Sequence, residues 1–312
     1  MTARLKARYS RDKKPAVRSR RAKFLERAMD FQVPALPQHI RTVLALGTAA
    51  EINARRIAAA IHRDYGLTLR LYRVLNSAFF SPGRRQVLSM RFIVVLLGQS
   101  NLAKILSGIP VLQGSQPELM QEHGYALMLM ARSLVAAEMA FSLSDNYNMQ
   151  TEKIVPCAIL KNSGRIITAF LSSEAGEVMF DDITMELKGK EVKRLTGWMP
   201  DELAITLLTR WNLPELAIKN LYHLSEIKQG LSRENYRIVL MAHAVNSLVS
   251  LAGQKGTGRR QNDIRVMMIK KLGVSQKGID KAFQEAVANF RKENPFFSEI
   301  IDQNDLLKHL LV

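Results

Sequence analysis

Apolar residues recur at the spacing of an α-helix along almost the whole chain, and this feature constrains the fold more than any other. Stripes of this kind lie within residues 40–46, 57–61 and 67–75. Alternation of apolar and polar residues between turns, which is typical of a half-buried strand, is scarce. Residues 125–143 and 231–252 are long stretches without Gly or Pro. We therefore predict an all-α protein.

One apolar run, Phe92–Leu97, would also suit a short buried strand. Ser89 precedes it and is a preferred residue at the N-cap of a helix, where its hydroxyl accepts a backbone N–H. Gly98 follows it and suits the position after a helix end, where a positive φ is common. The flanking residues therefore favour a short helix over a strand.

Proline and glycine divide the chain into parts. Pro34 and Pro37 separate an N-terminal segment from the first core helix, and the Gly-Ser-Gln-Pro sequence at 114–117 predicts the main boundary. We expect three parts: a basic, mobile arm at 1–27, an N-terminal helical subdomain at 28–116 and a second helical subdomain at 117–312. No repeat of constant period is visible, which argues against a solenoid.

The chain carries a formal net charge of +17, and its positive residues are concentrated near the N-terminus. Residues 1–27 hold eleven basic and two acidic residues, a net charge of +9. Such an arm repels itself and attracts anionic partners such as nucleic acid. The alternative is a solvated terminus that only aids solubility. The candidate anion contacts are Arg18, Arg20 and Arg21 in the arm and Lys255, Arg259 and Arg260 in a glycine-rich basic loop.

Residue type and spacing exclude several kinds of chemical site. The single cysteine, Cys157, excludes a disulfide framework and a multi-cysteine zinc site. No two of the six histidines lie three or four residues apart, so no pair of metal ligands forms on one helix. The stretch 125–143 contains Arg132 and Glu138, whose charges are costly inside a bilayer. We therefore expect a buried helix, no membrane span and a cytoplasmic protein.

Four short motifs follow one another between residues 31 and 290. They are Val33-Pro34-Ala35-Leu36-Pro37, Asn76-Ser77-Ala78-Phe79, the segment from Leu88 to Gly98, and Trp211-Asn212-Leu213-Pro214. In this order and spacing the chain resembles the HDOD domain, a bacterial regulatory relative of the HD metal-dependent phosphohydrolases. The resemblance implies a multi-helix HD-like bundle with an N-terminal helical subdomain. It also implies structural roles for Asn76, Ser77, Gly98, Trp211, Asn212 and Pro214.

The HD enzymes hold a divalent metal with a His, a His-Asp pair and a distant Asp. The resemblance places these positions on His123, on Lys161-Asn162 and on His243. A hard divalent cation is bound by carboxylates, whereas Lys161 brings a positive charge and Asn162 a neutral oxygen. The chain contains no His-Asp dipeptide that could replace the pair. The resemblance therefore implies no metal, no cofactor and no catalysis.

The remaining residues of that site still suggest two interpretations. A pocket formed by His123, Lys161, Asn162, Arg165 and His243 would be electropositive and could bind an anion such as a nucleotide phosphate. The alternative is a filled vestige of the site in which Asn162 only bonds to backbone.

Three functions follow from these features. The resemblance implies a non-catalytic signal-transduction module that contacts a protein partner. The basic arm and loop suggest a nucleotide- or nucleic-acid-binding protein instead. A metal phosphohydrolase with relocated ligands is the third alternative.

Overall fold

The computed structural model of the 312-residue chain describes residues 15–48, 53–77, 87–173, 189–227, 230–252, 254 and 256–298. Within these ranges the regular secondary structure is helical, apart from one isolated bridge between Ala35 and Val111. The predicted all-α class is confirmed.

Four helices pack on one another to form the N-terminal part of the fold: α3 (Pro37–Gly47), α4 (Ala54–His62), α5 (Tyr65–Leu75) and α6 (Met90–Ser107). Ser89 is the N-cap of α6, and its hydroxyl accepts the N–H of Phe92 at 3.3 Å. Gly98 adopts a φ of +65° and interrupts the helix, which resumes and continues to Ser107. Ser89 and Gly98 therefore bound a short helix, as their types predict, and the helical path then goes on beyond it.

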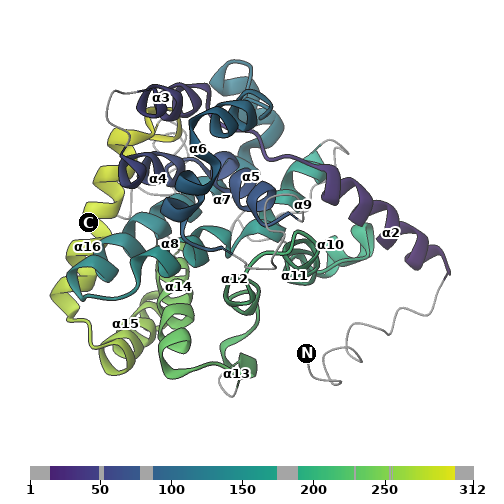
Figure 1. The fold of residues 1–312 in the computed structure, drawn as a ribbon. Helices are drawn as coiled ribbons and strands as arrows, with labels where there is room; N and C mark the ends of the chain where they lie inside the picture. Colours follow the sequence, from purple (N-terminus) through teal and green to yellow (C-terminus); the bar gives the residue numbers. More distant parts are fainter. Residues whose placement is uncertain are drawn as a thin grey trace.

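The longest helix, α7 (Gln116–Asn146), runs through the centre of the molecule (Figure 1). It begins within the Gly-Ser-Gln-Pro sequence at 114–117, where the Glu118 carboxylate accepts the backbone N–H of Ser115 at 2.8 Å. Four helices pack against it: α8 (Thr151–Leu160), α9 (Ser163–Ser173), α14 (Arg233–Leu251) and α16 (Gln276–Glu293). Packing on several sides explains why α7 lacks a strong polar face.

The other described helices lie around this centre: α2 (Pro15–Asp30), α10 (Gly189–Thr196), α11 (Pro200–Arg210), α12 (Glu215–Lys219), α13 (Leu224–Ile227) and α15 (Gly258–Leu272). Within the described ranges, three stretches are apolar and long enough to be membrane spans by length and composition alone: 90–107, 117–146 and 151–172. In the fold, the windows in the second and third are each 83% buried inside the protein, whereas that in the first is 33% buried.

The N-terminal basic segment differs from the expected mobile arm from residue 15 onward. Helix α2 contacts α9, α10 and α11, which belong to the second half of the chain. Phe24, Leu25 and Ala28 form its buried stripe. These apolar residues recur at helical spacing among the charges, so burying them holds the helix on the protein in spite of its net charge. The first fourteen residues lie outside the described part.

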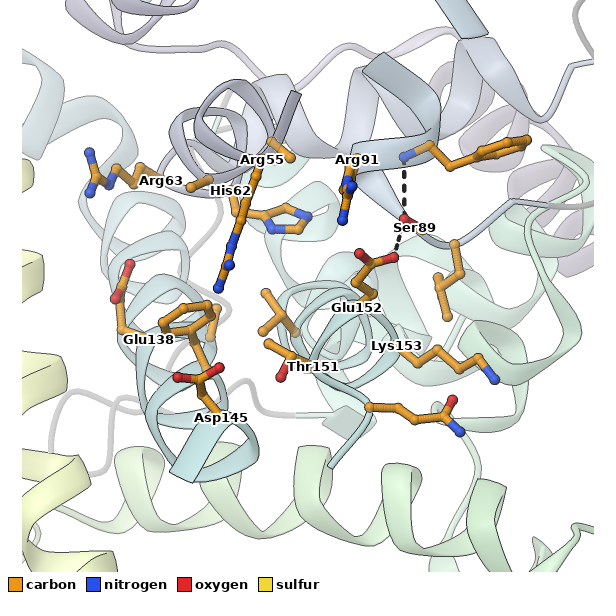
Figure 2. A pocket seen from close by; sticks show the side chains of 18 of the residues that line it. Arg55, His62, Arg63, Ser89, Arg91, Glu138, Asp145, Thr151, Glu152 and Lys153 are labelled. Atoms are coloured by element: carbon orange, nitrogen blue, oxygen red, sulfur yellow. Dashed lines mark hydrogen bonds between the residues drawn. The ribbon is translucent and has the colours of Figure 1, made fainter. Parts of the chain in front are cut away.

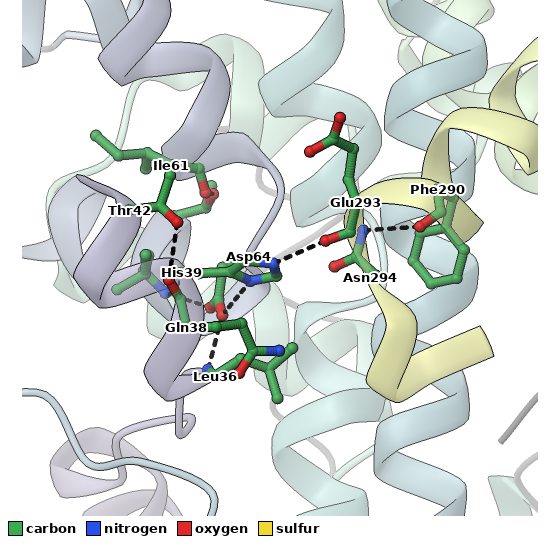
Figure 3. A network of polar contacts seen from close by, with 11 residues as sticks. Leu36, Gln38, His39, Thr42, Ile61, Asp64, Phe290, Glu293 and Asn294 are labelled. Atoms are coloured by element: carbon green, nitrogen blue, oxygen red, sulfur yellow. Dashed lines mark hydrogen bonds and ion pairs between the residues drawn. The ribbon is translucent and has the colours of Figure 1, made fainter. Parts of the chain in front are cut away.

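A buried polar network joins the N-terminal helices to α16 (Figure 3). Asp64 accepts the N–H of Leu36 at 2.8 Å and that of Leu67 at 2.9 Å, the second as the N-cap of α5. Its carboxylate also lies 3.1 Å from His39 Nδ1. On the other side of the ring, His39 Nε2 lies 3.2 Å from the carbonyl oxygen of Glu293 at the end of α16. His39 therefore bridges segments that are 254 residues apart.

This geometry makes stability depend on pH. Burial opposes protonation of His39, but its hydrogen bond to Asp64, the Asp64 charge and the Glu293 carbonyl outweigh burial and raise its pKa above the usual value. A raised pKa in the folded state stabilises the protein below the pKa of the unfolded chain, about 6.5, and this contribution is lost as the pH rises through the folded value.

We therefore expect His39→Gln to lower the free energy of unfolding by about 1–3 kcal/mol, more at about pH 5.5 than at about pH 9. Urea titrations of the wild type and of His39→Gln at each pH give the two free energies of unfolding. Subtracting one from the other removes the contribution of all other groups that titrate in both proteins. An equal loss at the two pH values would contradict a protonated His39 bridge.

Candidate functional site

Lys161, Asn162, Arg165 and His243 line one cavity of about 280 Å³. Lys161 and Asn162 form the turn between α8 and α9, Arg165 lies on α9 and His243 on α14. The other lining residues are Tyr125, Leu129, Arg132, Asn246, Ser247 and Ser250. The fold thus brings together four of the five residues of the predicted electropositive pocket.

Lys161 lies at the centre of this polar cluster. Its ammonium donates to the carbonyl oxygen of Asn220 at 2.8 Å and lies 3.1 Å from His243 Nε2. Burial lowers the pKa of Lys161 to about 8 because desolvation penalises its charge. Burial, together with the positive charge of Lys161, lowers the pKa of His243 to about 3. His243 is therefore neutral at physiological pH.

Asn162 and Arg165 are each held by other side chains. Asn162 Nδ2 donates to Ser133 Oγ at 3.0 Å and to Asn246 Oδ1 at 3.1 Å. Arg165 forms a two-pronged ion pair with Asp201, with N–O distances of 2.8 and 3.2 Å. The expected backbone bond of Asn162 is replaced by bonds to side chains of α7 and α14.

His123 does not line this cavity. Its ring packs on Phe170, with the centroids 5.1 Å apart, and its Nε2 lies 3.5 Å from a carboxylate oxygen of Glu122. The residue of α7 that meets Asn162 is Ser133, ten residues later and about 15 Å further along the helix. The contribution of α7 to the cavity therefore comes from a later turn than the predicted His123. Asn246, three residues after His243 and on the same helical face, also contributes and was not among the predicted site residues.

These residues do not fit a divalent metal. The polar groups that line the cavity are an ammonium, two amides, an imidazole, two guanidinium groups and three hydroxyls, and none of its lining residues is a carboxylate. A hard cation needs anionic oxygens, and the Lys161 charge would repel it. Within the described ranges, no three His, Cys, Asp or Glu side chains cluster as a metal-binding group.

Two of the motif residues bond to the backbone and connect the motifs to each other. Asn76 is fully buried and donates to the carbonyl oxygens of Tyr72 and Val87, both at 3.0 Å. Its Oδ1 accepts the N–H of Val87 at 2.8 Å. Asn212, at a φ of +56°, donates from its side chain to the carbonyl oxygen of Asn76 at 3.0 Å. The motifs thus connect the end of α5 to the turn after α11.

The other motif residues occupy turns and helix ends. Ser77 Oγ donates to the Val74 carbonyl at 2.6 Å, and Pro214 is the N-cap residue of α12. The buried ring of Trp211 lies 4.9 Å from the Arg73 guanidinium, measured from its centroid. Residues 78–79 of the second motif lie outside the described part.

A second and larger site is a groove of about 1120 Å³ between the N-terminal helices and the rest of the fold (Figure 2). We call it the inter-helix groove. It is lined from α4 and the start of α6 on one side and from α7, α8 and α16 on the other. Its apolar lining residues are Ala58, Ala59, Val87, Leu88, Phe92, Ala137, Phe141, Val155, Pro214 and Leu216.

Charged residues of both signs surround this apolar lining. The labelled ones in Figure 2 are Arg55, Arg63, Arg91, Glu138, Asp145, Glu152 and Lys153. Ser89 Oγ donates to the Glu152 carboxylate at 2.5 Å, which ties the start of α6 to α8. Burial raises the pKa of Glu138 and lowers that of His62 to about 4, so His62 is neutral. No pattern in the sequence predicted this groove.

Large apolar side chains are exposed at the groove. Phe92 is 40% exposed and Phe141 44% exposed, and both line it. Val95 and Leu96, which follow Phe92 on α6 and are not among the lining residues of the groove, are 63% and 51% exposed. Exposed apolar residues that gather beside a groove are typical of an interaction site.

The basic segments of the sequence do not form one surface. Arg20 donates to the Arg194 carbonyl at 2.6 Å, and the Arg21 guanidinium stacks 3.7 Å from the centre of the Trp198 ring. Arg259 and Arg260 are exposed at the start of α15, which Figure 1 shows on the opposite side of the molecule from α2. Arg18 lies in α2, without a described side chain, and Lys255 lies outside the described residues.

Comparisons with known proteins agree with this fold. The HDOD domain model matches residues 33–227. The solved structure of the MmoQ response regulator from Methylococcus capsulatus is similar, with a TM-score of 0.56 and 19% identity, covering 81% of this chain and 98% of that one. A virulence factor from Campylobacter jejuni gives a TM-score of 0.64 and 16% identity, covering 86% and 96%. A comparison with curated proteins finds no match.

Proposed function

The chain belongs to the HDOD domain family, and on that premise we propose that it is a regulatory module that acts by binding another protein and not by catalysis. The observation that carries this proposal is the inter-helix groove, with its apolar lining and its exposed Phe92 and Phe141. Burying exposed aromatic side chains is a main source of affinity between proteins.

The chemistry of the groove suggests the kind of partner. An amphipathic helix would place its apolar face on residues such as Leu88, Phe92 and Phe141. The charged residues at the edges of this partner helix would meet both acidic and basic residues, because the rim of the groove carries charges of both signs. Such a rim selects a partner by the order of the charges along its helix more than by the net charge of that helix. The similarity to a response regulator, a class of signalling protein, supports a regulatory setting.

The cavity around Lys161 supports the non-catalytic part of the proposal. The positions that the resemblance assigns to the His-Asp pair hold an ammonium and an amide, and the amide is bonded to Ser133 and Asn246. Neither can supply a metal-bound water for hydrolysis. Stoichiometric divalent metal in the purified protein, together with metal-dependent hydrolysis of a phosphate ester, would refute this part.

The partner proposal is tested by replacing both groove phenylalanines with serine. We expect a protein that binds the wild type to bind Phe92→Ser/Phe141→Ser at least about tenfold more weakly, since buried aromatic contacts at an interface contribute more than about 1–2 kcal/mol. The partner is identified by quantitative mass spectrometry of material captured from the native cell, and its affinity is then measured with purified proteins.

A matched control is available on α15. Val266 and Ile269 are 37% and 39% exposed and do not line the groove. Val266→Ser/Ile269→Ser removes a similar apolar surface, so we expect unchanged partner affinity. Equal binding by the groove variant and the wild type would overturn the proposal.

Nucleic-acid binding is the second candidate function. The net charge of +17 supports it, but the two basic segments lie apart and Arg20 and Arg21 are engaged with α10 and Trp198. Binding of generic DNA or RNA that weakens steeply with salt and is lost when residues 1–14 are deleted would favour it.

A further inference from the structure

The cavity around Lys161 combines positive charge with open space. Three of its lining residues are cationic: Arg132 from α7, Lys161 from the turn between α8 and α9, and Arg165 from α9. Asp201 pairs with Arg165, so that charge is compensated. The Lys161 ammonium lies beside two neutral groups: the Asn220 carbonyl and the imidazole of His243. Among the described residues, no carboxylate forms an ion pair with this buried ammonium.

A buried charge of this kind is costly without a counter-charge. An ammonium has three N–H donors, and Lys161 donates one of them to the Asn220 carbonyl. His243 Nε2 lies 2.7 Å from the same carbonyl oxygen, which can only accept, so this nitrogen carries its own proton and does not accept from Lys161. The other two N–H donors of Lys161 have no acceptor within the described part of the chain. Desolvation acts on Lys161 more strongly than the nearby Asp201 charge does, which agrees with an ammonium that lacks its anion.

We propose that this cavity binds the phosphate group of a small phosphorylated molecule, with Lys161 as the central cation. A phosphate presents several anionic oxygens in a tetrahedral arrangement, and here the cationic side chains come from α7, from the turn after α8 and from α9. A carboxylate is planar and has only two oxygens, so it would contact fewer of these cationic side chains. The hydroxyls of Ser247 and Ser250 line the same space and can donate to further oxygens.

The size of the cavity limits the ligand. Its volume of about 280 Å³ lies just below the range of about 300–1000 Å³ that is typical of sites for whole small molecules. It therefore suits a phosphate group and a few further atoms, with any larger remainder of the ligand outside. This site shares no lining residue with the inter-helix groove, so phosphate binding and partner binding can be tested independently of each other.

Calorimetric titration with inorganic phosphate at constant ionic strength tests the proposal. We expect saturable binding of one phosphate per chain, weakened at least about tenfold in Lys161→Met, since a charge-assisted hydrogen bond is lost. Lys271→Met is the matched control: Lys271 is exposed on α15, and we expect its loss to leave binding unchanged. Acetate at the same concentration should bind more weakly than phosphate.

Two further measurements complete the test. The first identifies the source of the phosphate group, and the second uses only the wild type, so that a folding defect of a variant cannot affect its result. Tighter binding of a phosphomonoester or pyrophosphate than of phosphate would point to a phosphorylated metabolite, and the reverse to the free ion. In the wild type, phosphate should slow acylation of Lys161 several-fold, followed by peptide mass spectrometry, and leave Lys271 unaffected. Absence of saturable binding, equal binding by Lys161→Met, or equal acylation with and without phosphate would each overturn the proposal.

Discussion

Asp64→Ala is expected to lower the free energy of unfolding by about 3–5 kcal/mol. The side chain is 1% exposed and accepts the backbone N–H groups of Leu36 and Leu67. Its removal takes away the N-cap of α5 and leaves the buried Leu36 N–H without an acceptor. It also takes away the carboxylate beside His39, whose bridge to α16 depends on it. One truncation therefore removes several interactions that connect distant parts of the chain.

Urea unfolding followed by circular dichroism measures this loss. Asp263→Ala is the control: Asp263 is exposed on α15, and a surface substitution of this kind changes stability by less than about 0.5 kcal/mol. Asp64→Asn keeps the volume and one acceptor oxygen, so we expect an intermediate loss. A cost of less than about 1 kcal/mol for Asp64→Ala would mean that the network does not stabilise the fold.

Gly164→Ala is expected to cost about 3 kcal/mol, the upper end for overpacking in a core. Gly164 lies near the start of α9, where that helix meets the first residue of α11. A Cβ atom on Gly164 would overlap the carbonyl oxygen of Pro200 and lie 2.8 Å from its carbonyl carbon. It would also lie 2.9 Å from the Cβ of Ala204. Backbone cannot yield as a flexible side chain does, so the two helices must move apart.

Gly258→Ala provides the comparison at the start of another helix. A Cβ there would meet nothing within 4 Å, so we expect unchanged or slightly increased stability because alanine restricts the unfolded chain. Thermal and urea unfolding of both variants measure the contrast. If Gly164→Ala unfolded like the wild type, the close approach of α9 to α11 would be refuted.

Helical class and several helix ends could be predicted because they depend on nearby residues. The apolar period follows from 3.6 residues per turn, and Ser89 and Gly98 act through bonds and dihedral angles within a few residues. The start of α7 has the same local origin, in Ser115 and Glu118. Such signals are complete within a short window of sequence.

The position of a residue along a long helix is a different matter. His123 has the residue type of an HD ligand, but α7 has 31 residues and its spacing does not tell which turn faces the cavity. The tertiary packing selects Ser133 and places His123 on Phe170. The resemblance did predict that Lys161, Asn162 and His243 lie at one site, and they line one cavity. It could do so because a family pattern reflects which distant residues meet in the fold.

The all-helical class and the family resemblance could be inferred from residue types and their spacing, and the resemblance predicts that Lys161-Asn162 stands at the positions of the His-Asp pair. The burial of Phe24 and Leu25, which holds α2 on the protein, and the placing of Arg55 and Glu293 in one groove depend on the packing of distant segments. The two kinds of feature differ in the distance along the chain over which they are set. Helix periods and caps are set by neighbours along the chain, whereas cavities and burial depend on which distant faces pack together.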